Sequence, residues 1–161
     1  MMNLFESEMR KPEILLLDYQ ATLVSNFWER NAWREKNEYA PYTEWIKKER
    51  LRSWIPKLAQ KEGVKVILIT ARNAKYKKQT LEHIKQVLGW MPDEWYFNEE
   101  NKAPQYCKRD VLHRYIYRKY GYDKKRYVAF ESNKVKREMY TKEGIFSLRV
   151  GDTPLEKIPR V

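Results

Sequence analysis

The stretch ILLLDYQATLV, residues 14–24, decides the fold because it joins a strand pattern to a polar turn. Four aliphatic residues in a row are typical of a strand that is buried on both faces of a parallel sheet. Asp18 follows directly, where that strand is expected to end. Two other runs, VKVILI at 64–69 and YVAF at 127–130, have a similar composition and predict two more buried strands.

Weaker patterns fill the rest of the chain. Residues 146–150 alternate like an edge strand, and residues 95–97 form a candidate fifth strand. Between the strands, apolar residues recur at helical spacing and a glycine follows each segment, in residues 42–60, 75–88, 106–120 and 134–143. Pro56 is expected to kink or divide the first of these helices.

This alternation of strands and helices predicts the fold class. It indicates an α/β protein with three layers, a Rossmann-like parallel sheet carrying helices on both faces. At 161 residues the chain is long enough for one domain with a sizeable core, so we expect residues 1–161 to form a single domain. Residues 25–62 are expected to form an extended loop and one helix, which leaves no segment long enough for a separate cap domain.

The composition limits the function classes. The net charge is +11 and aromatic residues make up 14% of the chain, which favours polyanionic partners: nucleic acid, nucleotides or phosphorylated substrates. The same charge could serve only solubility. The chain contains no apolar run of about 18 residues, so no membrane span is expected. With no apolar signal core near the start and a single cysteine, Cys107, we expect a cytoplasmic protein without an internal disulfide or a cysteine-based zinc cluster.

Ligands in parallel sheets bind beyond the carboxyl ends of the strands, so the residues at those ends are the candidates for a site. They are Asp18, Thr70 and Glu131. Lys108 lies some twenty residues before the last of them, in a helical pattern. Carboxylates, a hydroxyl and an ammonium group at one sheet edge are suited to phosphate chemistry, because an aspartate can carry a phosphoryl group and a lysine offsets its charge.

The order of these residues resembles the four motifs of the haloacid-dehalogenase (HAD) superfamily. Within this superfamily, the sequence resembles the capless branch that contains the 3′-phosphatase domain of polynucleotide kinase-phosphatase. The shared features are ILLLDYQATLV, the TAR sequence at 70–72, a lysine on the helix before the last buried strand, and the tail TKEGIFSLRVG at 141–151. The absence of a cap would leave an open site that admits a large substrate.

The resemblance assigns roles to individual residues. It implies that Asp18 attacks phosphorus, that Thr70 holds the phosphoryl group and that Lys108 neutralises charge. Thr22 would help to bind the substrate, and a Mg²⁺ ion would be held by Asp18 and Glu131. A magnesium ion and a lysine would together offset the repulsion between two anions.

Two motifs depart from the family pattern. The general acid/base two residues after the nucleophile is replaced by Gln20, which cannot transfer a proton, and Ala21 replaces the usual glycine. Losing an acid/base typically lowers a rate by about 10²–10⁴-fold. Where the family has two adjacent acids, this chain has Glu131 and Ser132. The sequence therefore predicts an impaired phosphohydrolase or phosphotransferase acting on nucleotide or nucleic-acid phosphates.

Two alternatives remain open. The chain could be an inactive HAD-fold module that binds a nucleotide, nucleic acid or a protein partner. It could also resemble the true dehalogenases, which lack the second aspartate and carry a serine-asparagine pair like Ser132 and Asn133, although they enclose their substrate under a cap. Further candidates for substrate contact are Arg72, just after Thr70, and the aromatic and basic residues Trp28, Trp33 and Arg34.

Overall fold

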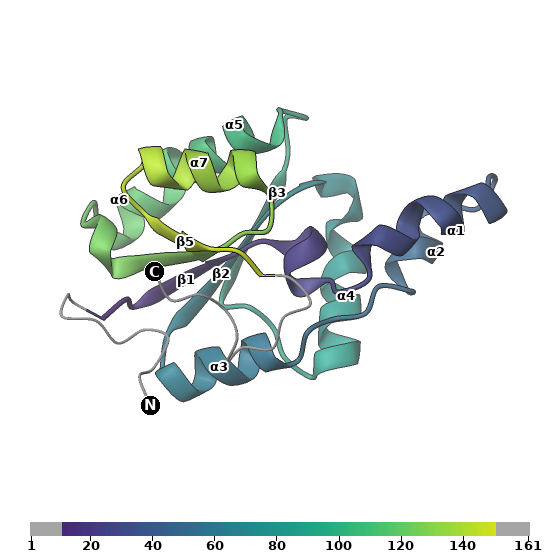
Figure 1. Cartoon of the computed structure of the whole chain (residues 1–161), viewed down its shortest axis with the longest axis horizontal. Coiled ribbons are helices and arrows are strands. Elements are labelled where there is room, and N and C mark those ends of the chain that lie inside the picture. Colours follow the sequence, from purple (N-terminus) through teal and green to yellow (C-terminus); the bar gives the residue numbers. More distant parts are fainter. Residues whose placement is uncertain (1–10, 151–161) are drawn as a thin grey trace.

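The computed structural model describes residues 11–150 and contains a five-stranded parallel sheet in the order β3-β2-β1-β4-β5 (Figure 1). The strands are β1 (Ile14–Leu17), β2 (Lys65–Asn73), β3 (Glu94–Asn98), β4 (Tyr127–Phe130) and β5 (Phe146–Leu148). The first strand lies at the centre, between β2 and β4, and all its residues are buried. The three apolar runs thus form the middle of the sheet. Residues 146–150 contain an edge strand, as predicted, and the candidate fifth strand at residues 95–97 lies in β3 at the other edge.

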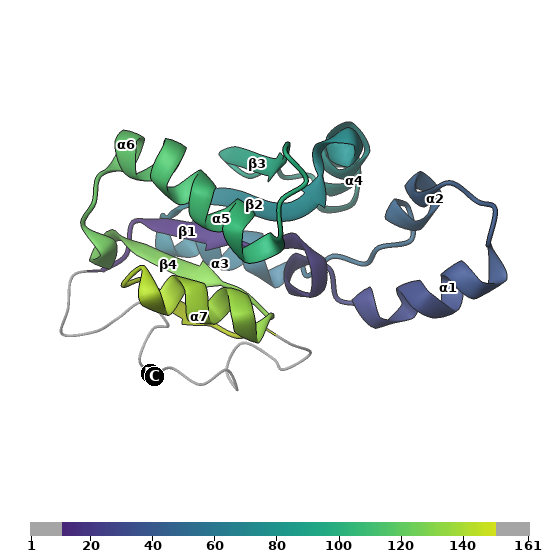
Figure 2. The same cartoon turned by 90° about the horizontal axis from the view of Figure 1, so that it is seen from above.

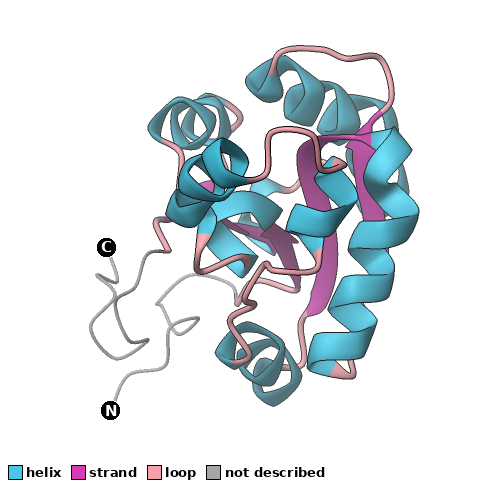
Figure 3. Cartoon of the chain, turned by 90° about the vertical axis from the view of Figure 1, so that its right-hand side faces the viewer, coloured by secondary structure: helices cyan, strands magenta, loops and turns pink. Residues whose placement is uncertain are grey.

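Helices cover both faces of the sheet (Figure 3). One face packs against α3 (Trp54–Glu62) and α4 (Lys77–Leu88). The other packs against α5 (Pro104–Val111), the π-helical segment Leu112–Ile116, α6 (Tyr117–Tyr120) and α7 (Lys134–Lys142). The predicted three-layer, Rossmann-like α/β fold is therefore confirmed for residues 11–150. Within residues 11–150 there is no helix with the length and apolar character to cross a membrane.

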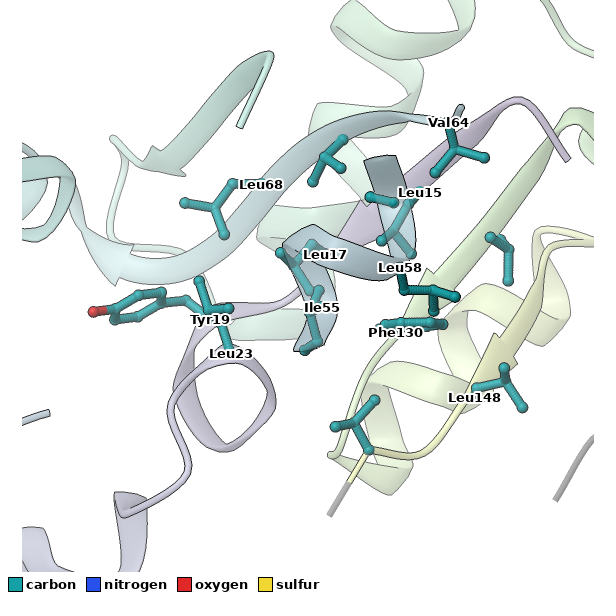
Figure 4. Packing of buried hydrophobic residues seen from close by; sticks show 14 of the residues in the cluster. Leu15, Leu17, Tyr19, Leu23, Ile55, Leu58, Val64, Leu68, Phe130 and Leu148 are labelled. Carbon is teal, nitrogen blue, oxygen red and sulfur yellow. The ribbon is translucent and has the colours of Figure 1, made fainter. Parts of the chain in front are cut away.

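Two cores result from the alternation of side chains along each strand. Leu15 and Leu17 point to one face, where they join Ile55 and Leu58 of α3 and Phe130 of β4 (Figure 4). Ile14 and Leu16 belong to the other core, with residues of α5 to α7. Because β1 is buried on both faces, it places the residue that follows it at a fixed point.

The segment after β1 differs from the prediction of a loop and one helix. It contains α1 (Arg30–Lys36) and α2 (Tyr42–Ile46) before α3, so the expected single helix over residues 42–60 is two helices. The break lies at residues 47–53, ahead of Pro56, which sits in the first turn of α3, where no backbone N–H is needed. Figure 2 shows α1 and α2 projecting beyond the carboxyl ends of the strands.

The chain leaves and re-enters the body of the domain at adjacent points. Val24 and Leu51 form an antiparallel bridge, and the Ser25 amide donates to the Arg50 carbonyl at 2.8 Å. The Asn26 side chain accepts from the Arg50 amide at 2.8 Å. Residues 26–50 therefore form an excursion with a closed base, which we call the α1–α2 projection.

Candidate functional site

Asp18 lies at the carboxyl end of the central strand and is held from two sides. Its amide donates to the Phe130 carbonyl at 3.1 Å, which continues the pairing of β1 with β4. Its Oδ1 accepts from Lys108 Nζ at 2.7 Å, and its Oδ2 accepts from Thr22 Oγ1 at 2.9 Å. The carboxylate is only 3% exposed.

Lys108 joins this carboxylate to a second one. Its Nζ also donates to Glu131 Oε1 at 2.6 Å, and the side chain has no exposed surface. Glu131 follows β4, directly beside the end of β1. Three of the residues expected at one edge of the sheet are thus in direct contact: Asp18, Lys108 and Glu131.

The two carboxyl groups have different protonation tendencies. Burial tends to raise the pKa of Asp18, but the ammonium groups of Lys108 and Lys136 outweigh burial and lower it. For Glu131 burial prevails, and the nearby Asp18 charge adds to it, so the pKa is raised despite Lys108. Between the two carboxylates, the pKa of Lys108 rises well above its usual value even though burial opposes this. Asp18 is therefore the member of the pair that ionises more readily.

Lys136 was not among the residues predicted for this site. It lies in the first turn of α7, with Nζ 3.9 Å from Asp18 Oδ1 and 3.8 Å from Glu131 Oε2. Next to it, Arg137 donates to the carbonyls of Glu131 at 3.2 Å and Ser132 at 2.7 Å. From the sequence, a lysine at the start of a helix is predicted to lie on the surface. Lys136 approaches the carboxylates only because α7 begins just after β4.

Thr70 lies within β2, the strand that pairs with β1, and not at the end of β2 as predicted. The register pairs Leu17 with Leu68, and β2 continues to Asn73, so Thr70 lies two residues beyond that pair. Its side chain is 1% exposed, and its Oγ1 accepts from the Arg72 amide at 3.1 Å. The structure thus places Thr70 on the strand beside the one that ends at Asp18, and its role as a phosphoryl ligand stays a prediction.

Arg72 is engaged inside the protein. Its guanidinium donates to both oxygens of Glu49, at 3.1 Å and 2.5 Å, and to the hydroxyls of Tyr42 and Thr80. Tyr19 also donates to Glu49, at 2.9 Å. The sequence suggested a contact with substrate, whereas the structure has a buried ion pair that fastens the base of the α1–α2 projection to β2.

Gln20 lies in the turn Tyr19–Leu23 that follows Asp18. Its Nε2 donates to the Tyr42 hydroxyl at 3.2 Å, which links this turn to α2. The next residue, Ala21, has φ of +62°, a conformation that glycine adopts at lower cost. The substitution noted in the sequence therefore falls on a backbone position where glycine is favoured.

Ser132 and Asn133 have structural contacts. Ser132 Oγ lies 2.9 Å from Thr22 Oγ1, and its single hydroxyl hydrogen can be donated to the carbonyl of Ala21 or to that of Val150. Asn133 caps α7 by accepting from the Lys136 amide at 3.1 Å, and its own amide donates to Glu131 Oε2 at 3.1 Å. These contacts account for the serine-asparagine pair without a dehalogenase reaction.

The three candidate residues of the α1–α2 projection differ in how far their side chains are exposed to solvent. Trp28 is 71% exposed. Trp33 is half-buried, with its ring centroid 5.8 Å from that of Trp45. Arg34 donates to carbonyls of the loop that follows α1, including that of Ala40 at 2.9 Å. Only Trp28 of the three presents most of its side chain to solvent.

The donor set does not fit the expected Mg²⁺ as it is arranged. Magnesium requires near-octahedral oxygen ligands. Each oxygen of Asp18 and Glu131 already accepts a hydrogen bond, from Lys108, Thr22 or the Asn133 amide. Along residues 11–150, no group of three or more His, Cys, Asp or Glu side chains is placed to hold a metal ion. A metal bound to Asp18 Oδ1 or Glu131 Oε1 would have to displace the Lys108 ammonium group, and one bound to Glu131 Oε2 would face the Lys136 ammonium group.

Comparisons with known proteins bear on the fold. No family model and no curated protein matches the chain. A chain of the Pnkp1/Rnl/Hen1 RNA repair complex is similar, with a TM-score of 0.65 and 18% identity over 88% of this chain and 44% of that one. A hydrolase from Streptococcus pneumoniae TIGR4 gives a TM-score of 0.56 and 9% identity, with 86% and 92% covered.

A third similar structure is the N-terminal part of the protein BF1531 from Bacteroides fragilis, which contains a phosphatase domain complexed with Mg. Its TM-score is 0.51 with 17% identity, covering 89% of this chain and 36% of that one. This chain thus spans less than half the length of the RNA-repair and Bacteroides chains. The likeness covers 86–89% of this chain and shows that the chain shares the fold of these three structures.

Proposed function

We propose that this chain is a phosphohydrolase or phosphotransferase that acts on a nucleotide or nucleic-acid phosphate through Asp18. The observation that carries the proposal is the contact of Asp18 Oδ1 with Lys108 Nζ at 2.7 Å, at the carboxyl end of the central strand. This ammonium group keeps the Asp18 carboxylate ionised in a buried position and offsets charge when an anion approaches.

The reaction follows from this geometry. The Asp18 carboxylate attacks phosphorus, the bond from phosphorus to the ester oxygen breaks, and an aspartyl-phosphate forms. Water then attacks that phosphorus, releases inorganic phosphate and regenerates the carboxylate. The leaving oxygen takes its proton from solvent, because Gln20 has none to give. We expect turnover to be slow for this reason.

The substrate class rests on charge. A net charge of +11 favours polyanions, and the similar chain in an RNA repair complex supports a nucleic-acid phosphate as the substrate or ligand. The aromatic and basic residues of the α1–α2 projection lie beyond the strand ends, on the side where such a substrate would enter (Figure 2).

The second candidate is a binding module without turnover. It is favoured by the closure of the site, since Asp18 is 3% exposed and Lys108 and Glu131 are not exposed at all. A substrate would have to displace a neighbouring side chain to reach Asp18. In this case the HAD-like fold would serve to hold a nucleotide, a nucleic acid or a protein partner.

Release of inorganic phosphate tests the proposal. The purified chain is incubated with 3′-phosphorylated DNA, 3′-phosphorylated RNA and nucleotides, with EDTA and separately with Mg²⁺. We expect slow release that the Asp18→Asn variant abolishes, because an amide cannot act as the nucleophile. Release at the same rate from both proteins would point to a contaminant, and binding without release would favour the second candidate.

A further inference from the structure

Lys136 stands on the outer side of the two carboxylates, whereas Lys108 lies on the inner side. Its Nζ is nearly equidistant from Asp18 Oδ1, at 3.9 Å, and Glu131 Oε2, at 3.8 Å. Its side chain is 13% exposed, against 3% for Asp18 and none for Glu131. Lys136 is therefore the more exposed of the two lysines at these carboxylates.

The positive charges in this cluster outnumber the negative ones without a metal. Asp18 and Glu131 carry at most two negative charges, and Lys108 and Lys136 carry two positive charges. The Arg137 guanidinium, bonded to the carbonyl of Glu131, adds a third. A divalent cation added to this set would face at least two ammonium groups at close range, and like charges in a buried site repel strongly.

The position of Lys136 has a cost for its helix. Cations in the first helical turn oppose the positive end of the helix dipole. Its distances to the two carboxylates, 3.8 Å and 3.9 Å, are longer than those of hydrogen bonds, so these contacts do not explain its placement as a structural anchor. An ammonium group held close to two carboxylates without being fixed to them is free to turn toward an incoming anion.

We infer that the Lys136 ammonium takes the place of the divalent cation in this site, so that a phosphoryl group binds beside Asp18 without Mg²⁺. This inference rests on the proposed function, because it concerns the same site. An incoming phosphate accepts charge-assisted hydrogen bonds from the ammonium groups of Lys108 and Lys136. These bonds replace the contact that the phosphate oxygens would otherwise make with a metal ion.

The first experiment measures binding of inorganic phosphate by isothermal titration calorimetry, in EDTA and in Mg²⁺. We expect the wild type to bind equally in both. Lys136→Met should weaken binding in EDTA by about ten- to a hundred-fold, the effect of losing one hydrogen bond to a charged group. The matched control is Lys134→Met, which removes the same charge from an exposed position in the same helical turn and should change binding little.

The second experiment titrates Mg²⁺ alone, after circular dichroism has established that each variant is folded. We expect no binding to the wild type, and binding to Lys136→Asp, which replaces the ammonium group by a third carboxylate. Mg²⁺ binding to the wild type that Asp18→Asn removes would overturn the inference, even if the chain proves to be a phosphatase. So would a Lys136→Asp variant that gains no Mg²⁺ binding.

The two experiments separate the inference from the proposed function. If no substrate releases phosphate in a way that Asp18→Asn abolishes, the proposed function fails. The magnesium titration still decides whether Lys136 holds the position of the cation. If phosphate binds only with Mg²⁺, or if Lys136→Met binds as well as the wild type, the inference fails and the proposed function stands.

Discussion

Arg72 and Glu49 form a bidentate ion pair in which both side chains are almost completely buried, at 1% and 0% exposure. Arg72 comes from β2, and Glu49 lies between α2 and α3. Tyr19, the residue that follows Asp18 in the sequence, donates its hydroxyl hydrogen to the Glu49 carboxylate. The pair therefore couples the α1–α2 projection to the strand ends that carry the candidate site.

Removing one partner of this pair should destabilise the whole fold. Glu49→Gln leaves the Arg72 guanidinium buried without a counterion, so we expect a loss of roughly 3–5 kcal/mol in the free energy of unfolding. Urea denaturation followed by circular dichroism measures it. Glu29→Gln is the control, because it breaks the exposed pair with Arg50 and should change stability little. Equal effects of the two substitutions would contradict the buried role of Glu49.

Lys108 should stabilise the protein in a pH-dependent way. Burial tends to raise the pKa of Asp18, and Lys108 is the largest of the effects that lower it. In Lys108→Met both carboxyl groups therefore have raised pKa values and are penalised when ionised. A raised pKa in the folded state means that stability falls as pH rises.

The variant should accordingly be much less stable than the wild type at about pH 7, and the difference should shrink toward about pH 5, where its carboxyl groups bind protons. Urea denaturation at the two pH values checks this. A difference that stays constant or grows on acidification would mean that Lys108 acts through packing alone.

Restoring a carboxyl group at position 20 should raise phosphatase activity. Gln20→Asp supplies a proton donor and acceptor in the turn after Asp18, and the Tyr42 hydroxyl that now faces Gln20 remains available to orient it. We expect an increase of up to about 10²–10⁴-fold in phosphate release. Gln20→Asn, which keeps an amide, should give none. If Gln20→Asp is no faster than its parent, the deficit lies at Glu131 and Ser132.

Much of the fold could be predicted because buried parallel strands leave a strong local pattern. The aliphatic run before Asp18 marked the central strand, and the order of the motifs brought together Asp18, Lys108 and Glu131. The pairing of Arg72 with Glu49 could not be foreseen, because it depends on where residues 26–50 return to the sheet. Lys136 was missed for a related reason, since its charge acts on residues that belong to other elements.

The break between α2 and α3 was also misplaced, for a different reason. Apolar residues keep a helical spacing from residue 42 to residue 60, so the pattern alone predicts one helix. The Arg52 amide instead donates to the Leu23 carbonyl at 2.8 Å, and the Arg52 guanidinium donates to the carbonyls of Thr22 and Val24. Hydrogen bonds to the turn after Asp18 thus replace those of a continuous helix.

Binding of single-stranded nucleic acid should depend on Trp28 more than on its neighbours. Trp28 is exposed on the α1–α2 projection, and an exposed indole can stack on a base, which contributes about 1–3 kcal/mol for each base. Trp28→Ala should therefore weaken binding to a single strand and leave the melting temperature unchanged. Trp33→Ala should lower the melting temperature, because its ring packs against Trp45.

Fluorescence anisotropy with a labelled single strand measures binding, and the affinity should fall as salt rises because counterions are released. Trp95→Ala is the control, since Trp95 is also exposed, at 39%, but lies on the edge strand β3. Equal losses for Trp28→Ala and Trp95→Ala would remove the α1–α2 projection from the binding surface. Wild-type affinity that does not respond to salt would mean that the charge of +11 does not act on phosphates, and the basic surface would then serve solubility alone.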